Sequence, residues 1–316
     1  MTAHDARRPR AMRALTGWRV GGIVKRNSRA YAPLTGVTSM RSGRIALTLS
    51  GGGVRGFAHI GVLKALEARG WRPDLLTGAS MGGIVAAAYA SGMSVAEMEQ
   101  EALALTSLRR LAQLLDRKPT ATGLIAGDRL LHYFRTKLRK ARFQDLAVPL
   151  GLMAVDCTTG EQVPLRDGDV ALAVRATMAF PGVFAPVEIG GRTLVDGGAS
   201  DNLPVALARE MGAERVVAVD VCPRSAPCLG SDNADDGTSL VPAPRLMALM
   251  QRGFDLIMAT LTDLRLEQCP ADVLIRPEVP ASVGTFTGFT RIPECIAAGE
   301  RAVQEHEDAL RRVFEG

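Results

Sequence analysis

The stretch Asp74-Leu75-Leu76-Thr77-Gly78-Ala79-Ser80-Met81-Gly82 joins a short apolar run to the Ala-rich run 84–90. The first run predicts a buried strand and the second a helix, so the serine between them lies on a tight strand-to-helix turn. Gly78 and Gly82 allow such a strained turn to form without clashes. The helix that begins at Met81 directs its free N–H groups and its dipole toward the same point, where they stabilise negative charge. We therefore expect Ser80 to attack an acyl carbon.

The same alternation of strand and helix begins earlier in the chain. The run 45–49 is mainly apolar and predicts a buried strand, and a glycine-rich turn follows at 50–56. Residues 58–68 carry apolar side chains at helical spacing before Gly70 ends the helix. The order strand, helix, strand, helix predicts parallel strands with right-handed crossovers, and so an α/β fold.

The glycine-rich turn contains Gly51-Gly52-Gly53-Val54-Arg55-Gly56. Successive glycines let backbone N–H groups turn to one side and form a nest that binds anions. The spacing also fits the G-x-G-x-x-G pattern of dinucleotide-binding loops, and Asp74 follows at about the distance of 20 residues expected for their acidic residue. Spacing alone leaves both interpretations open. However, parallel strands bring this loop and Ser80 to the same edge of the sheet, which suits an oxyanion hole.

A base for Ser80 is not found among the histidines. The chain has four of them, His4, His59, His132 and His306, and none follows a late strand as a Ser-His-Asp hydrolase requires. Asp196 follows the predicted strand 192–195 and precedes Gly197-Gly198, which we call the base turn. Its carboxylate could remove the hydroxyl proton directly if burial raises its basicity, although a plain glycine turn is the simpler interpretation of this motif alone.

The rest of the chain continues the α/β pattern. Residues 94–140 look mainly helical, with breaks at Pro119 and Gly123. Further strands are expected at 150–155, 187–195 (with a hairpin turn at Gly190-Gly191), 215–221 and 271–279, and further helices at 204–212, 245–267 and 291–314. Residues 222–242 are rich in Pro, Ser, Asp and Gly and predict a surface loop.

Composition limits the class of protein. The 316 residues are 47% hydrophobic and 22% charged, which is typical of a soluble globular protein. The five cysteines, Cys157, Cys222, Cys228, Cys269 and Cys295, are scattered and lack the spacing of a zinc site, so we expect reduced thiols in a cytoplasmic protein.

Basic residues are concentrated in the first 44 positions. This segment has ten Lys or Arg against one acid, Asp5, a net charge of +9 when the whole chain carries +5. We expect residues 1–44 to form a flexible basic arm and residues 45–316 the folded domain. The arm could make peripheral contact with an anionic membrane, at its inner face, and its lack of interleaved aromatic residues argues against nucleic acid.

Three motifs in this order, Gly51 to Gly56, Gly78 to Gly82 and Asp196-Gly197-Gly198, resemble those of the patatin-like phospholipase family. Three other stretches resemble its bacterial members: Ala154-Val155-Asp156 with Thr159-Gly160-Glu161, Pro181 to Val187, and Asn202-Leu203-Pro204-Val205. The resemblance covers about Ile45 to Ala302 and implies a three-layer α/β/α sandwich with a central, mostly parallel sheet. One departure is Thr177, which stands where bacterial relatives tend to have serine.

The resemblance also implies roles for residues. By position, Ser80 is the nucleophile and Asp196 its base, with no histidine, metal or other cofactor. Gly51 to Gly56 form the oxyanion hole through the amides of the 52–54 stretch, and Arg55 braces the loop. The implied activity is hydrolysis of fatty-acyl esters of phospholipids or lysophospholipids. Two alternatives stay open: a non-catalytic lipid- or acyl-binding regulator, and an acyltransferase that uses the same two residues.

Overall fold

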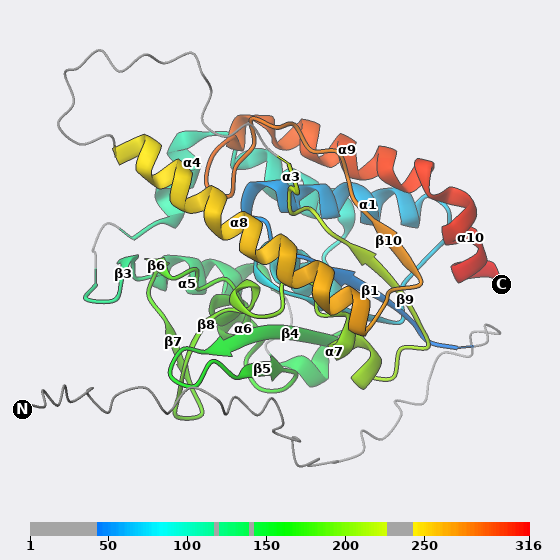
Figure 1. Cartoon of the computed structure of the whole chain (residues 1–316), viewed down its shortest axis with the longest axis horizontal. Coiled ribbons are helices and arrows are strands. Elements are labelled where there is room, and N and C mark those ends of the chain that lie inside the picture. The colour runs from blue at the N-terminus through cyan, green and yellow to red at the C-terminus, as the bar shows by residue number, and fades with distance from the viewer. Residues whose placement is uncertain (1–42, 117–119, 139–141, 226–242) are drawn as a thin grey trace, which may run out of the picture. The chain divides into compact units, whose positions relative to one another are not determined.

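The computed structural model describes residues 43–116, 120–138, 142–225 and 243–316 (Figure 1). Nearly all of the expected basic arm, 1–44, and most of the expected surface loop, 222–242, lie outside the described residues.

Among the described residues, the main sheet has eight strands. They are β1 (Ile45–Leu49), β2 (Leu75–Gly78), β4 (Leu150–Asp156), β5 (Gln162–Leu165), β7 (Val187–Ile189), β8 (Arg192–Asp196), β9 (Arg215–Val219) and β10 (Val273–Ile275). Their order is β10-β9-β1-β2-β4-β8-β7, with β5 paired to β4. The strands from β10 to β4 are parallel, whereas β5, β8 and β7 pair in antiparallel fashion. The prediction of a mostly parallel sheet is confirmed, and one end of the sheet is antiparallel.

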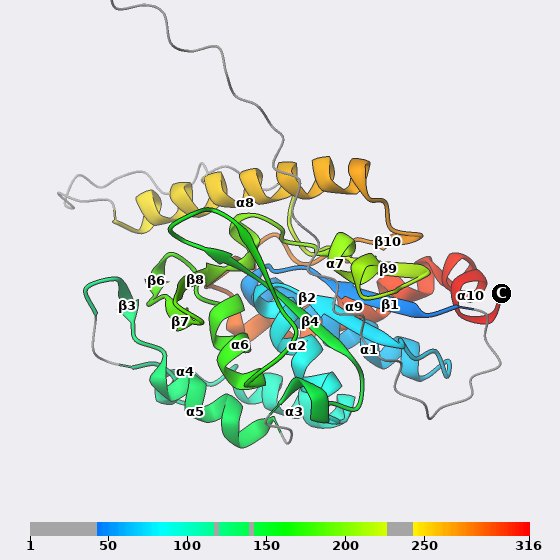
Figure 2. The same ribbon diagram turned by 90° about the horizontal axis from the view of Figure 1, so that it is seen from below.

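Helices cover both faces of this sheet, so the domain has three layers (Figures 1 and 2). One face carries α1 (Ala58–Glu67), α2 (Ser80–Ala90), α6 (Val170–Thr177) and α9 (Ile292–Glu305), and the other carries α7 (Val205–Glu210) and α8 (Ala243–Gln268). The expected α/β/α sandwich is therefore confirmed.

The strand β1 shows why the sheet is covered on both sides. Side chains of a strand alternate between its two faces. Ile45, Leu47 and Leu49 are buried in the core that includes α1, α2 and α9, whereas Ala46 is buried in the core that includes α7. A strand that is apolar on both faces needs a helical layer on each.

The C-terminal helix predicted at 291–314 is in fact two helices, α9 and α10 (Glu307–Glu315), which are divided at His306. α9 packs on α1 through glycines. A Cβ at Gly61 would lie 1.8 Å from the Ile296 carbonyl oxygen, and a Cβ at Gly299 would lie 1.9 Å from that of Ala58. The two helices therefore touch backbone to backbone, which no larger residue would permit.

The segment 94–140 is less helical than predicted. It contains α3 (Val95–Ala104), α4 (Leu108–Leu114) and α5 (Asp128–Lys137), but also the strand β3 (Gly123–Ile125). β3 pairs in parallel with β6 (Gly182–Phe184) in a small second sheet. A strand of three residues has too little periodicity to be recognised in the sequence, and its partner is distant along the chain. The predicted break at Pro119 lies outside the described residues.

Four short 3₁₀ helices complete the described elements: Gly53–Phe57, Phe143–Asp145, Gly197–Ala199 and Phe289–Arg291. In the part of the chain that the structure describes, no helix is both long and apolar enough to cross a bilayer.

Candidate active site

Ser80 lies at the junction of β2 and α2 with a backbone φ of +50°. Among the described residues it is the one non-glycine residue with a positive φ, a conformation that costs energy for any residue with a Cβ. Its neighbours must be small: a Cβ at Gly82 would lie 2.3 Å from the Leu49 carbonyl oxygen, and one at Gly78 2.8 Å from the Gly82 backbone. The strained strand-to-helix turn expected from the sequence is present.

Thr177 holds the backbone of this turn. Its Oγ1 accepts a hydrogen bond from the Ser80 N–H at 3.1 Å and donates one to the Met153 carbonyl oxygen of β4. The side chain is fully buried at the end of α6. The Ser80 amide is therefore already engaged and is not free to bind a substrate oxygen. The sequence marks Thr177 only as a departure from bacterial relatives.

Asp196 ends β8 and lies next to Ser80. Its carboxylate accepts a hydrogen bond from the Gly198 N–H at 2.8 Å and lies close enough to the Ser80 hydroxyl for that group to lower its pKa as a hydrogen-bond donor. Burial raises the pKa of this carboxyl to about 6, against the lowering effect of the two hydrogen bonds. A Cβ at Gly197 would lie 2.2 Å from the Met153 carbonyl oxygen, so the base turn needs glycine to pack on β4.

The glycine loop, residues 51–56, lies beside Ser80 and forms the third part of the site. The Gly51 N–H donates to the Asn202 carbonyl oxygen at 3.1 Å, and a Cβ at Gly51 would lie 2.9 Å from the Ser80 Cβ. The structure thus brings together all three motifs that the sequence singled out. The amides of Gly52 and Gly53 have no hydrogen-bond partner among the described residues.

The expectation that the Val54 amide is free to take part in the oxyanion hole is wrong. The Val54 N–H donates to the Thr285 carbonyl oxygen at 3.1 Å. The segment that contains Thr285 also packs tightly on Gly53, whose Cβ would lie 2.0 Å from the same oxygen and whose φ is +58°. Thr285 is far from Val54 along the chain, so no local pattern predicts this hydrogen bond.

Arg55 is buried and braces the glycine loop. Its guanidinium pairs with the Asp255 carboxylate of α8 at 2.9 Å, and both side chains are almost fully buried. It also donates to the Val283 carbonyl oxygen at 3.3 Å and to the Thr285 hydroxyl at 3.0 Å. Through these bonds of its two terminal nitrogens, the side chain fixes the loop to α8 and to residues 283–285.

Replacing Asp255 by Ala is expected to lower the free energy of unfolding by about 3–5 kcal/mol, because it leaves the Arg55 charge buried without its partner. The matched control is Asp263→Ala on the same helix. Asp263 pairs with Arg224 and Arg276 but is half exposed, so its loss should cost at most about 1 kcal/mol. Urea denaturation of both variants measures the difference, and equal losses would contradict the bracing role of Arg55.

Two further buried residues were missed as parts of the site. Asn202 accepts the Gly51 N–H, and its Nδ2 donates to the Gly51 carbonyl oxygen at 3.4 Å and to the Cys222 Sγ at 3.1 Å. His59 is fully buried, and its Nε2 lies 2.8 Å from the Ser50 carbonyl oxygen. Burial lowers the pKa of His59 to about 4, so the ring is neutral and anchors the end of β1. The sequence could have indicated Asn202 as part of the site, because the Asn202-Leu203-Pro204-Val205 stretch resembles bacterial members of the family.

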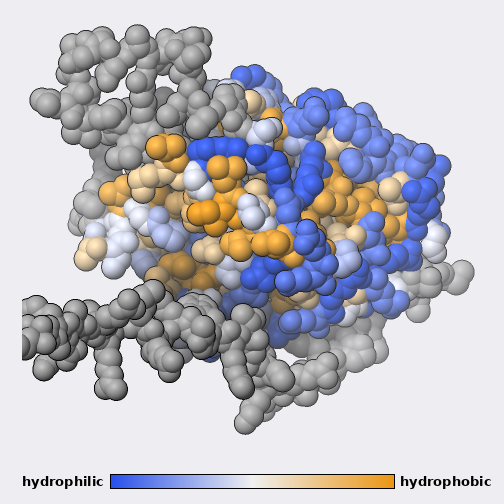
Figure 3. All heavy atoms as spheres, viewed as in Figure 1, coloured by the Kyte–Doolittle hydropathy of each residue, from blue (hydrophilic) through white to orange (hydrophobic). Residues whose placement is uncertain are grey.

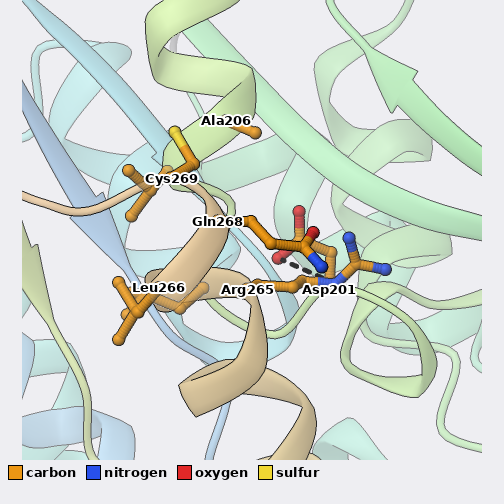
Figure 4. A pocket seen from close by; sticks show the side chains of 8 residues that line it. Asp201, Ala206, Arg265, Leu266, Gln268 and Cys269 are labelled. Carbon is orange, nitrogen blue, oxygen red and sulfur yellow. Dashed lines mark ion pairs between the residues drawn. The ribbon is translucent and has the colours of Figure 1, made fainter.

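The site consists of a hydroxyl, a carboxylate and backbone amides. In residues 43–116, 120–138, 142–225 and 243–316 there is no group of three or more His, Cys, Asp or Glu that could hold a metal ion. A separate small cavity of about 50 Å³ lies between α7 and the C-terminal end of α8, where Asp201 faces Arg265 at 4.0 Å (Figure 4). Neither Ser80 nor Asp196 lines it.

Comparison with known sequences identifies a family that matches this part of the chain. A family model described as patatin-like phospholipase matches residues 47–209, a range that contains all three motifs. An uncharacterised NTE family protein of Mycobacterium tuberculosis is 37% identical over 185 residues, which are 58% of this chain and 51% of that protein. Human patatin-like phospholipase domain-containing protein 6 is 36% identical over 200 residues, 61% of this chain and 14% of that protein. The match spans about half the length of the mycobacterial relative and a small part of the human one.

Two solved structures resemble the chain more distantly. VipD from Legionella pneumophila has a TM-score of 0.45 and 14% identity, over 85% of this chain and 66% of that chain. The ExoU–SpcU complex from the type III secretion system of Pseudomonas aeruginosa has a TM-score of 0.43 and 19% identity, over 87% of this chain and 53% of that chain.

Proposed function

The chain belongs to the patatin-like phospholipase family, and from this premise we propose that it is a serine hydrolase of carboxylic esters. The proposed substrates are fatty-acyl esters of phospholipids or lysophospholipids. The observation that carries the proposal is the pairing of the Ser80 hydroxyl, on its strained turn, with the buried Asp196 carboxylate.

In the first half of the reaction, the Ser80 Oγ attacks the ester carbonyl carbon while Asp196 takes the hydroxyl proton. The carbonyl oxygen becomes negatively charged and the ester C–O bond then breaks. The leaving alcohol takes the proton back from Asp196, and an acyl group remains on Ser80. In the second half, water attacks the acyl carbon, gives its proton to Asp196, and releases the fatty acid as the proton returns to Ser80.

The negative oxygen needs hydrogen-bond donors. Since the Ser80 and Val54 amides are engaged elsewhere, we assign this role to the amides of Gly52 and Gly53. The N-terminus of α2, which begins at Ser80, adds a favourable dipole at the same place.

A carboxylate with an ordinary pKa is a weak base. Burial of Asp196 raises its pKa to about 6, so it is both ionised near neutral pH and basic enough to share the hydroxyl proton. Asp196 therefore serves as a base without the help of a histidine.

A fluorophosphonate probe is expected to label Ser80, because such probes react with activated serines. The labelling rate should be constant above pH 7 and should fall about tenfold per pH unit below about 6, where Asp196 becomes protonated and can no longer accept the proton. Mass spectrometry of the labelled peptide identifies the residue, and the rate at each pH gives the midpoint.

The alternatives give different results in this experiment. A non-catalytic lipid-binding regulator leaves the probe unreacted at all pH values. An acyltransferase labels like a hydrolase, but it transfers the acyl group to an added alcohol in preference to water, which product analysis detects. A midpoint near the ordinary range of an aspartate, around pH 4, would contradict the assignment of the buried carboxylate as the base.

For residues 1–44 we propose a separate role, peripheral contact with an anionic membrane. Their net charge of +9 would attract them to an anionic lipid surface, which suits a cytoplasmic enzyme that acts at the inner face of a membrane.

A further inference from the structure

The outer face of α8 is apolar. Five large side chains on it are 44–63% exposed: Leu249, Met250, Leu256, Ile257 and Leu264. They follow one another at helical spacing and form a single stripe, which we call the α8 stripe. Figure 3 shows hydrophobic residues gathered along α8 on this side of the molecule. Such a patch on a soluble domain usually marks an interaction surface.

The inner face of the same helix forms a wall of the candidate active site. Asp255 pairs with Arg55 of the glycine loop, and the Met258 methyl group would lie 2.8 Å from a Cβ at Gly198. Both side chains are buried. One helix therefore separates the site from the exposed stripe.

An aromatic cluster joins the stripe to the site. Phe254, which is adjacent to the α8 stripe on the helix surface, packs edge-on against Phe180 at 4.6 Å between ring centroids, and Phe180 packs against Phe286 at 5.2 Å. Phe180 follows Ala179, whose carbonyl accepts the Asp196 N–H, and Phe286 follows Thr285, whose carbonyl accepts the Val54 N–H. Phe286 is 38% exposed, so the apolar surface continues from the stripe toward the site.

We propose that the α8 stripe docks the protein on a phospholipid bilayer. The proposal rests on the proposed function, because it places a lipid substrate at the site. A hydrolase of membrane lipids must take its substrate from an aggregate, and a stripe of aliphatic side chains inserts into the interface of a bilayer.

The charges around the stripe fit a lipid surface. Between Leu249 and Leu264 the acidic residues are Asp255 and Asp263, and each is ion-paired with arginine. Arg252 donates to the carbonyl oxygens of Pro223 and Arg224 and keeps its positive charge. The stripe thus offers no unpaired negative charge to a membrane whose cytoplasmic leaflet is anionic.

The test is sedimentation of the full chain with phosphatidylcholine vesicles in about 0.5 M salt, which shortens the Debye length and removes electrostatic attraction by the basic arm. The double variant Leu256→Gln with Ile257→Gln should bind at least about tenfold more weakly than the wild type, because two half-exposed apolar side chains no longer enter the bilayer. The matched pair is Leu256→Gln against Leu103→Gln. Leu103 lies on α3 and is 37% exposed, against 44% for Leu256, and α3 lies on the opposite side of the sheet in Figure 2.

Only the Leu256 variant of this pair should lose affinity. Equal binding of the double variant and the wild type, with equal unfolding midpoints, would overturn the proposal. It would also be overturned if sedimentation velocity without lipid found a wild-type dimer that the double variant does not form, since the stripe would then bind a second copy.

Failure of the docking proposal is distinguishable from failure of the proposed function. Ser80→Ala keeps the stripe and should bind vesicles like the wild type. Vesicle binding by a wild type that hydrolyses no ester would remove the hydrolase assignment and leave the docking surface, and the opposite result would remove only the docking surface.

Discussion

Ser80→Ala is expected to lower the kcat for a short p-nitrophenyl ester by at least about 10⁴-fold, which leaves only the residual catalysis that substrate binding and the oxyanion hole supply. The hydroxyl is the only group at this position that could form the acyl-enzyme. Steady-state kinetics at pH 8 measures the loss.

The backbone of this turn offers a sharper control. Ser80 has a φ of +50°, which glycine adopts at no cost and which costs a residue with a Cβ about 1 kcal/mol or more. Ser80→Gly should therefore be as inactive as Ser80→Ala but more resistant to urea. Substantial activity in either variant would remove Ser80 from the mechanism. Far-ultraviolet circular dichroism checks that both variants are folded, since an unfolded variant would be inactive for a reason other than the missing hydroxyl.

Asp196→Asn is expected to reduce kcat by about 10³–10⁴-fold, because a neutral amide cannot take the Ser80 proton. The amide oxygen can still accept the Gly198 N–H, so the base turn should keep its shape. Steady-state kinetics with the same ester measures the loss at pH 8.

Although Asp196→Asn should be less active than the wild type, it should be more stable at pH 8. Burial raises the pKa of Asp196 from 3.8 to about 6, so the folded protein holds this proton more tightly than the unfolded chain does. Stability therefore falls as pH rises from about 4 through 6, and the Asn variant escapes this loss, by up to about 3 kcal/mol at pH 8. Urea denaturation at pH 5 and pH 8 measures it.

These results would exclude a mechanism in which a histidine is the base for Ser80. Full activity of Asp196→Asn, together with inactivity of His59→Gln, would make His59 the base. We expect the reverse, because the His59 Nε2 is bonded to the Ser50 carbonyl oxygen in a fully buried position.

Much of the site could be predicted from local sequence. The turn around Ser80 requires small residues at 78 and 82, and its flanking strand and helix are marked by apolar runs. The Asp196 turn and the glycine loop carry similar local marks, and each follows a buried strand. Since β1 and β2 are parallel neighbours, the glycine loop and Ser80 had to meet at one edge of the sheet. β8 is antiparallel to β4, so only its register, with Asp196 opposite Ala154, brings Asp196 to the same place.

Other predictions failed where the pattern was short or the contact distant. The strand β3 was missed because three residues show no periodicity. The Val54 amide was misassigned because its partner, Thr285, arrives from the other end of the domain. The long helix at 291–314 was predicted as one element because the apolar spacing continues across His306.

The sequence by itself determined the α/β class, the turn at Ser80, the carboxylate at Asp196 and the glycine loop, because each depends on residues that are neighbours in the chain. Only the tertiary structure decided that Thr177 takes the Ser80 amide, that Asp255 neutralises Arg55, and that α8 has one face toward the site and one toward solvent. The physical reason is that these contacts join residues about 100 or 200 positions apart. They form only when the packing of whole layers brings the side chains together, which no local pattern of apolar and polar residues encodes.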